Sequence, residues 1–321
     1  MMMLMTNTQL KTLLAVADTG SVVGASRRLF VSSAAVSSTL AALSREVGTE
    51  LTVRVGRGLA LTPAGTVLAG YASTLLGAME EALVRSREAS QPDAPTLRIG
   101  AVATVGEELL PRWLQGYLEL VPHATINLEV ANKTTLFELL GDHRVDLVIS
   151  GRPTQSEFVR VIATRGHELA LIANERRATE WFDGSLSPTS QQIGEHTWLV
   201  REPGSGTRAS AEELLGELAI SPPTLSVGSN LAMKRLVELG LGVAIISTES
   251  VAKELADGEL VSLTVEPLPQ RRSWCLVVRT GEVLAEGIKH FVNYLGSMGE
   301  VEFTPEPHVL GEKVEGPRRL G

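Results

Sequence analysis

The sequence predicts an α/β protein of more than one domain, because its apolar pattern changes character twice along the 321 residues. Short apolar stripes with helical spacing occupy residues 8–47, and one longer stripe follows at residues 62–82. From residue 97 onward, strand-like runs alternate with helical ones. With 44% hydrophobic and 21% charged residues, the chain has ordinary globular composition and is long enough for two domains or more.

The N-terminal region predicts three short helices and a two-stranded wing. An apolar stripe begins at Leu10, and Gly20 can end that first helix. Residues 30–32 form a three-residue turn before a third helix, which Gly48 ends. Residues 51–61 then alternate around a Gly-Arg-Gly tip, which is typical of a hairpin. We therefore expect a winged helix-turn-helix.

Small polar side chains and arginines on this motif predict contact with double-stranded DNA. The second helix of a helix-turn-helix enters the major groove, where hydroxyls bond phosphates or base edges, and wing arginines reach phosphates. Residues 1–65 hold six basic and three acidic side chains, a net +3, which leaves −11 for the rest of a chain at −8. The alternative is a solvated helical subdomain with ordinary surface serines. The candidate DNA-binding residues are Arg27, Arg28, Ser32, Ser33, Ala34, Ser37, Ser38, Arg54 and Arg57.

A long helix is predicted after Thr62-Pro63, and its apolar stripe is typical of a dimer seam. The apolar residues recur at spacings of 3, 4, 3 and 4, as in a short coiled coil. The alternative is a helix packed on its own domain, but the stripe lies between two domains rather than inside one. It consists of Leu68, Tyr71, Leu75, Ala78 and Ala82, and a linker at Ser90–Pro95 follows the helix.

Alternating strands and helices after residue 97 predict α/β units with a largely parallel sheet, more comfortably as two small domains than as one. The expected strands are Leu97–Ala101, Ile126–Val130, Asp146–Ser150, Leu169–Ala173, Trp198–Val200, Leu225–Val227, Val243–Ile246 and Trp274–Val278. The expected helices include Glu107–Leu120, Thr134–Leu140, Ala209–Leu218 and Leu231–Leu239. Residues 299–321 carry Gly, Pro and charge without periodicity, and we expect them to be disordered.

A glycine-containing, hydroxyl-rich segment before one of these helices predicts a site for a small anion. Free backbone N–H groups at a helix start bind anions, and the helix dipole assists. Because the body of the chain is acidic, an anion needs such a local concentration of donors. The alternative is a helix cap beside a turn. The candidate residues are Thr104, Asn132, Ser205, Gly206, Thr207, Arg208 and Asn230, of which both asparagines are equally consistent with caps.

Catalytic and metal-binding patterns are missing from the sequence. The six histidines are scattered without a pair at helical ligand spacing, and no Gly-x-Ser-x-Gly motif occurs. The single cysteine, Cys275, lies in an apolar strand and is expected to be a packed thiol, which fits a reducing cytoplasm. The apolar runs are much shorter than the ~20 residues of a membrane span. We therefore expect a cytoplasmic protein without enzymatic activity, cofactor, metal or membrane segment.

The N-terminal residues resemble the DNA-binding domain of LysR-type transcriptional regulators, and the resemblance continues to about residue 298. The matching residues are Gly20-Ser21, Ala25, Leu29, Val31-Ser32, Ala35-Val36-Ser37, Leu43, Gly48, Leu51, Arg54, Arg57 and Leu61-Thr62-Pro63-Ala64-Gly65. The family usually has Ser-Gln-Pro-Ala-Val-Ser where residues 32–37 read Ser-Ser-Ala-Ala-Val-Ser, often a basic residue at Ser38, and Leu-Glu at Leu43-Ser44. The resemblance implies a linker-helix dimer, commonly assembled into a tetramer, and an effector domain of the periplasmic-binding-protein type with two subdomains.

The domain organisation expected from pattern and resemblance together has four parts. They are a winged helix-turn-helix at 5–63, a linker helix and hinge at 64–92, an effector-binding domain at 93–298, and the tail at 299–321. Within the effector domain, subdomain I takes about 93–163 plus 266–298 and subdomain II about 164–265. The predicted function is a sequence-specific transcriptional regulator, a homodimer or homotetramer, controlled by a small anionic metabolite. The alternative is a small-molecule-binding module without DNA function.

Overall fold

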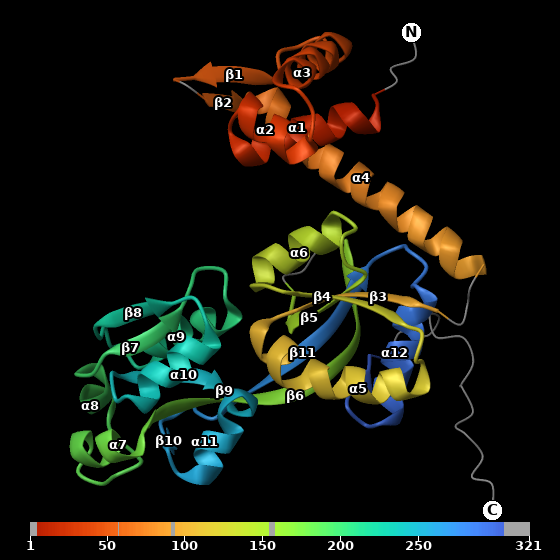
Figure 1. Cartoon of the computed structure of the whole chain (residues 1–321). Coiled ribbons are helices and arrows are strands. Elements are labelled where there is room, and N and C mark those ends of the chain that lie inside the picture. Colours follow the sequence, from red (N-terminus) through yellow and green to blue (C-terminus); the bar gives the residue numbers. More distant parts are fainter. Residues whose placement is uncertain (1–4, 57, 91–93, 154–157, 305–321) are drawn as a thin grey trace, which may run out of the picture. The chain divides into compact units, whose positions relative to one another are not determined.

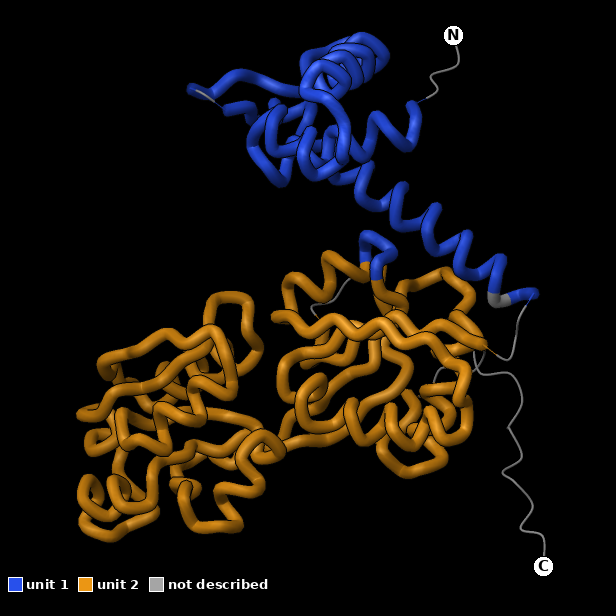
Figure 2. Tube along the Cα trace, in the orientation of Figure 1, with its two compact units in different colours: residues 1–90, 141–144 blue, residues 91–140, 145–321 orange. Residues whose placement is uncertain are grey.

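The computed structural model describes residues 5–56, 58–90, 94–153 and 158–304, and the chain forms two compact units (Figures 1 and 2). Unit 1 consists of residues 1–90 together with the short segment 141–144. Unit 2 consists of residues 91–140 and 145–321.

Unit 1 contains the predicted helices and wing. Its elements are α1 (Asn7–Thr19), α2 (Val22–Leu29), α3 (Ser33–Val47), β1 (Thr52–Val55), β2 (Gly58–Leu61) and α4 (Pro63–Ser90). Strands β1 and β2 pair antiparallel, as a wing requires. The winged helix-turn-helix predicted from the sequence is therefore confirmed (Figure 1).

Local signals in the sequence account for the helix boundaries of unit 1. The Ser21 hydroxyl accepts a hydrogen bond from the Gly24 amide at 3.0 Å and so caps α2. Gly20 and Gly48 end α1 and α3 with left-handed backbone, at φ of 62° and 81°. The Ser44 hydroxyl accepts a hydrogen bond from the Leu51 amide at 3.3 Å and ties α3 to the start of the wing.

Helix α4 has two apolar sides. Ala72 and Leu76 on one side are buried against α1 residues Leu10 and Leu14. On the other side, Tyr71 is 67% and Leu75 47% exposed. The exposed stripe has i, i+4 spacing and differs from the predicted one, because Leu68 packs on the helix-turn-helix core. Its residues are Val67, Tyr71, Leu75, Met79 and Leu83.

By length and composition, α4 is also apolar enough to cross a membrane, since residues Pro63–Arg87 reach a mean hydropathy of 1.2. A helix in the core of a soluble protein can have the same length and hydropathy. Four charged side chains lie near the C-terminal end of this stretch, namely Glu80, Glu81, Arg85 and Arg87. This one helix is therefore weak evidence for a membrane span.

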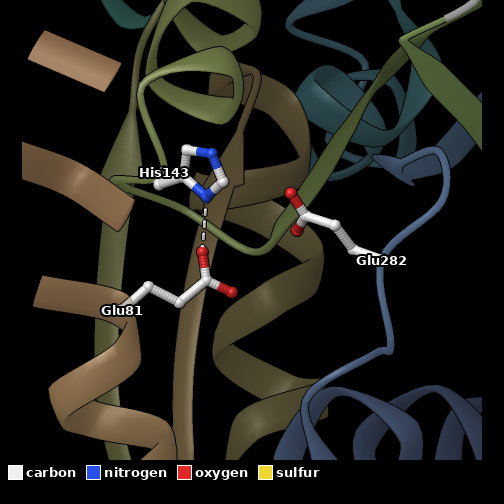
Figure 3. A group of neighbouring side chains, drawn as sticks. All are labelled: Glu81, His143 and Glu282. Atoms are coloured by element: carbon white, nitrogen blue, oxygen red, sulfur yellow. Dashed lines mark hydrogen bonds and ion pairs between the residues drawn. The ribbon is translucent and has the colours of Figure 1, made fainter. Parts of the chain in front are cut away.

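The segment 141–144 belongs to unit 1 because it packs on α4. The Ser73 hydroxyl donates to Oδ2 of Asp142 at 2.5 Å. Figure 3 shows His143 pointing toward Glu81, with Nδ1 of the ring 2.6 Å from Oε2 of the carboxylate. The absence of a side chain at Gly77 permits this approach, because a Cβ there would lie 1.7 Å from the carbonyl oxygen of Asp142. The third residue drawn, Glu282 of unit 2, accepts from Nε of Arg279 at 2.6 Å.

Unit 2 is built on one mixed sheet. Its strands are β3 (Thr96–Ala101), β4 (Thr125–Val130), β5 (Leu147–Gly151), β6 (Val159–Asn174), β7 (Trp198–Arg201), β8 (Thr224–Val227), β9 (Val243–Ser247), β10 (Leu260–Leu263), β11 (Gln270–Arg279) and β12 (Glu302–Phe303). Its helices are η1 (Val105–Leu109, a π-helix), α5 (Leu110–Leu120), α6 (Lys133–Gly141), α7 (Glu175–Trp181), α8 (Ser190–Gly194), α9 (Gly206–Glu217), α10 (Asn230–Glu238), η2 (Thr248–Val251, a 3₁₀ helix), α11 (Ala252–Asp257) and α12 (Glu286–Ser297). The main strand order is β4-β3-β5-β11-β6-β9-β7-β8.

Two lobes share this sheet. The first lobe has its cores among residues 97–163 and 274–301, and the second lobe has its cores among residues 169–268. Each lobe contains parallel strands, β3 with β4 and β5 in the first and β7 with β8 and β9 in the second. The long strands β6 and β11 run antiparallel to each other from one lobe to the other (Figure 1).

Two expectations about this region need correction. The sheet is mixed rather than largely parallel, because the expected strand Leu169–Ala173 is the end of the 16-residue β6, which pairs antiparallel with β9, β10, β11 and β12. The predicted start of the disordered tail, residue 299, is too early. Val301 is buried in the core of the first lobe, and β12 pairs with β6. The remainder of that tail, 305–321, lies outside the described residues.

Close backbone packing at the start of α4 gives a testable prediction. A Cβ at Gly65 would lie 2.0 Å from the carbonyl oxygen of Leu51, whereas a Cβ at Gly70 meets nothing within 4 Å. We expect Gly65→Ala to destabilise the helix-turn-helix by about 2 kcal/mol through overpacking. Gly70→Ala, the matched control, should stabilise α4 by up to about 1 kcal/mol through helix propensity. Hydrogen exchange of the α1–α3 amides measures both, and equal protection in the two variants contradicts the prediction.

Candidate functional site

The first candidate site is the exposed side of α3. All five predicted residues of this helix start, Ser32, Ser33, Ala34, Ser37 and Ser38, are exposed. Two of their hydroxyls are already engaged. Ser32 caps α3 by accepting from the Ala35 amide at 3.1 Å, and Ser33 donates to the Ser26 hydroxyl at 3.2 Å. The sequence did not predict these local roles, which leave Ser37 and Ser38 as the outward-facing hydroxyls one turn further along.

Arginines border this side of the unit. Arg27 and Arg28 occupy the last turn of α2 and are exposed, and Arg28 forms an ion pair of 2.7 Å with Asp18. Arg54 is exposed on β1 of the wing. The predicted contact residue Arg57 lies outside the described residues. An exposed helix with small side chains beside exposed guanidinium groups is an arrangement that fits a major groove flanked by phosphates.

The second candidate site is a cavity of about 610 Å³ in unit 2. Both lobes line it, and so do the strands β6 and β11 that join them. Several lining segments directly follow the carboxyl ends of parallel strands, which is where ligands bind in open α/β sheets. The lining residues include Val102–Thr104, Ala131–Lys133, Gly151–Arg152, Arg201, Ser205–Thr207, Asn230 and Arg271–Cys275.

Two helix N-termini meet at this cavity. Helix α6 begins at Lys133 in the first lobe, and α9 begins at Gly206 in the second. The loop between β7 and α9 lies close to the start of α6. A Cβ at Gly204 in this loop would lie 3.2 Å from the Thr134 hydroxyl. Ser205 is the N-cap residue of α9, but its hydroxyl accepts no hydrogen bond from the first-turn amides of this helix. Converging helix starts present several N–H donors and positive dipole ends to the same space.

Hydrogen bonds connect the two lobes at the edge of the cavity. The Thr104 hydroxyl of the first lobe accepts from Nδ2 of Asn230 and from the Ser250 hydroxyl, both at 3.1 Å. Asn230 in turn accepts from Nη1 of Arg201 through Oδ1. All four residues, Thr104, Arg201, Asn230 and Ser250, are buried. Asn230 is therefore not the cap of α10, a role that Ser229 performs by accepting from the Ala232 amide.

The other predicted residues divide between the cavity and their own helices. Asn132 lines the cavity, but its Oδ1 accepts from the Thr135 amide at 3.0 Å and caps α6. Ser205, Gly206 and Thr207 line the cavity. Arg208 is not among the lining residues, because its guanidinium pairs with Glu212 at 2.7 Å and donates to the Arg201 carbonyl.

Sequence reasoning missed the cations of the cavity. Five basic residues line it, namely Lys133, Arg152, Arg201, Arg271 and Arg272, while Glu213 is the only carboxylate among the described lining residues. Arg201, Arg271 and Arg272 are paired with Glu202, Glu168 and Glu213 respectively. Within the part of the chain that the structure describes, Lys133 and Arg152 make no ion pair.

A signal for three of these cations was present in the sequence. Lys133, Arg152 and Arg201 each stand at or within three residues of the carboxyl end of a predicted strand, the edge where ligands bind. Arg271 and Arg272 had no such signal, because they lie on β11, whose crossing into the second lobe depends on the tertiary fold.

Burial sets the protonation of two further lining residues. Burial raises the pKa of the Cys275 thiol, while the positive charges of Arg152 and Lys133 oppose this. Burial, with Arg272 and Arg165 nearby, lowers the pKa of His167 to about 4. The His167 ring stacks on Trp274 at 3.9 Å between centroids, and its buried Nδ1 has no hydrogen-bond partner among the described residues. A packed neutral thiol and a neutral imidazole are therefore expected in the cavity wall.

Comparison with known proteins gives the same two-part division. The family model described as "Bacterial regulatory helix-turn-helix protein, lysR family" matches residues 7–66, and the model "LysR substrate binding domain" matches residues 90–299. The chain is 32% identical over 272 residues to the HTH-type transcriptional regulator CbbR of Rhodospirillum rubrum, covering 84% of this chain and 89% of that protein.

Two solved structures share the fold. Full-length CbnR complexed with its target DNA superposes with a TM-score of 0.67 at 20% identity, covering 91% of this chain and 99% of that one. The regulatory domain of Synechocystis PCC6803 CcmR in complex with 2-PG gives a TM-score of 0.58 at 24% identity, covering 63% of this chain and 96% of that one.

The buried His167 predicts a pH dependence of unit 2. In the unfolded chain the His167 imidazole takes up a proton as the pH falls below about 6.5. In the folded protein it does so only near pH 4, because its pKa is lowered to about 4. The free energy of unfolding should therefore decrease between pH 6.5 and 4, by up to about 3 kcal/mol from this residue. Urea unfolding followed by tryptophan emission measures it, since all 4 tryptophans lie in unit 2.

Replacing the ring tests the assignment. His167→Gln should make the decrease below pH 6.5 shallower, while His123→Gln, at an exposed position, should leave the pH profile of the wild type unchanged. Identical profiles for wild type and His167→Gln would contradict the prediction.

Proposed function

The chain belongs to the LysR family of DNA-binding transcriptional regulators, and we propose that a small anion bound between the two lobes of unit 2 controls its activity. The observation that carries the proposal is the convergence on one cavity of two helix N-termini and two cations, Lys133 and Arg152, that make no ion pair among the described residues. The family consists of regulators rather than enzymes, which fits a cavity built for binding.

The charge of the cavity supports an anionic effector. Lys133 and Arg152 supply positive charge from the first lobe, and the first-turn amides of α9 with the Thr207 hydroxyl supply donors from the second. Burial lowers the pKa of Lys133, and an anion beside the ammonium group would raise that pKa again by favouring the charged form. The relative CcmR, whose structure contains 2-PG, is consistent with effector binding by this domain type.

Effector binding would act by selecting one arrangement of the lobes. The lobes are joined by β6 and β11 and held at one edge by the Thr104–Asn230 hydrogen bond. A ligand that contacts both walls stabilises the arrangement in which both walls reach it, and the gain equals its differential affinity. The effector-dependent step is then a change in lobe angle, which the linker helix α4 passes to the DNA-binding units.

For the DNA-binding unit, we propose that α3 is the recognition helix. Ser37 and Ser38, with Ser33 and Ala34, would face base edges, while Arg27, Arg28, Arg54 and Arg57 would contact phosphates. The family usually has an amide and a cation where this chain has Ser33 and Ser38, so we expect a different operator from those of relatives that have them.

We also propose that the protein is a cytoplasmic homodimer paired through α4. The stripe from Val67 to Leu83 is exposed and apolar along four turns, which is the length of seam that two helices can bury. Two such dimers would assemble into a tetramer, as is common among LysR-type regulators.

The anion site is tested by calorimetry with inorganic phosphate, sulfate and a panel of organic acids. We expect at least one anion to bind, and Thr207→Val to weaken it about tenfold through loss of one charge-assisted hydrogen bond. Thr224→Val, at an exposed position of β8, is the matched control and should bind normally. Tight binding of a neutral or cationic ligand that is indifferent to Thr207→Val would falsify the anion site.

The seam is tested by sedimentation velocity of the full chain. Leu75→Glu places a carboxylate in the buried interface from both subunits, so dimers should dissociate at concentrations where the wild type remains paired. Leu239→Glu puts the same charge on an exposed leucine of unit 2 and should leave the sedimentation coefficient unchanged. A monomeric wild type, or a dimer that tolerates Leu75→Glu, would exclude this seam.

A further inference from the structure

Phe30 is the most exposed of the large apolar side chains in the described residues, at 95%. It occupies the turn between α2 and α3, so it lies on the DNA-binding unit and not in the effector cavity. Nothing in unit 1 covers the ring, although a phenylalanine offers roughly 150–250 Å² of surface for burial. The fold of the isolated chain therefore makes no use of this side chain.

The backbone at Phe30 does not favour phenylalanine either. Its φ is +55°, in the left-handed region where glycine and asparagine are the least costly residues. The residue ends α2, and its amide donates to the carbonyl of Arg27 at 3.4 Å. Any residue except proline can provide that amide. A bulky residue in left-handed backbone lowers the stability of the fold, and no contact of the ring within unit 1 offsets this cost. The side chain is therefore expected to contact another molecule.

The chain connection places this ring beside the start of the recognition helix. The Val31 amide donates to the Ser26 carbonyl at 3.0 Å and holds the turn against α2. Three residues span at most about 11 Å, so the Cα of Phe30 is within that distance of Ser33, the first residue of α3. The major groove is about 12 Å wide, so Phe30 lies within one groove width of the helix start that we propose to enter it.

The surroundings of the turn favour DNA over another protein as the partner. Arg27 and Arg28 precede Phe30 and are exposed, and the exposed serines of α3 follow it. This part of the chain carries a positive charge suited to phosphates. Among the bases, only thymine presents an apolar group, its 5-methyl, in the major groove.

We infer that the Phe30 ring contacts a thymine methyl group in the operator and thereby contributes to sequence preference. The contact would bury the ring and the methyl together, and so add an apolar contribution to the hydrogen bonds that the serines of α3 offer to base edges. The inference rests on the proposed role of α3 as the recognition helix and is independent of the effector proposal.

The experiment uses a duplex selected from a random pool by the wild-type chain and the same duplex with deoxyuridine in place of thymidine. This exchange removes only methyl groups and leaves base pairing intact. We expect the wild type to bind the deoxyuridine duplex about fourfold more weakly, the value of one buried methyl group. Phe30→Asn should bind the thymidine duplex about as weakly and should no longer distinguish the two duplexes.

Two further variants complete the test. Asparagine tolerates left-handed backbone, so Phe30→Asn should retain the circular dichroism and melting temperature of the wild type. Phe158→Asn, at a phenylalanine of unit 2 that is 82% exposed, is the matched control and should keep the wild-type discrimination. Equal wild-type binding to both duplexes overturns the inference. So does a Phe30→Asn variant that still discriminates between them, since the ring would then contact a sugar or a protein partner.

Discussion

The antiparallel pair formed by β6 and β11 is the constraint on which the rest of unit 2 depends. These two strands supply the only sheet pairing that joins β5 of the first lobe to β9 of the second, within the described residues. Each strand has one end in each lobe, so the lobes are separate cores on a common pair of strands. Stacking of His167 on Trp274 adds a side-chain contact within the pair, and Arg165 of β6 lies over the Trp113 ring of α5.

This architecture also locates the cavity and its charge. The strand pair forms its floor with Arg271, Arg272 and Trp274, while the strand ends of both lobes form its walls. A chain with a net charge of −8 thereby keeps a basic interior site, because local geometry rather than net charge decides what a cavity attracts. The acidic partners of Arg201, Arg271 and Arg272 reduce the unbalanced charge to a few groups, which leaves Lys133 and Arg152 as its main source.

In unit 1, close approach between backbone segments determines how helix α4 packs. Gly65 lets α4 begin against the carbonyl of Leu51, and Gly77 lets the segment 141–144 pack on the same helix. Helix α4 therefore has one side committed to contacts within unit 1 and the other side apolar and exposed. A helix with this division is suited to pairing with a second copy of itself.

The sequence by itself determined the elements of unit 1, because their signals are local. The cap at Ser21 and the left-handed glycines Gly20 and Gly48 act within four residues, so they can be identified without knowing the fold. The eight expected strands in unit 2 were also found, but β6 begins at residue 159 rather than 169 and β11 at residue 270 rather than 274, and β10 and β12 were not expected. The tertiary structure alone decided that β6 and β11 cross between lobes, and so it alone brought Arg271 and Arg272 to the cavity. It also turned Arg208 toward Glu212 and joined Thr104 to Asn230. These outcomes depend on the order of strands in the sheet, which results from packing two whole cores, and no short stretch of sequence specifies that order.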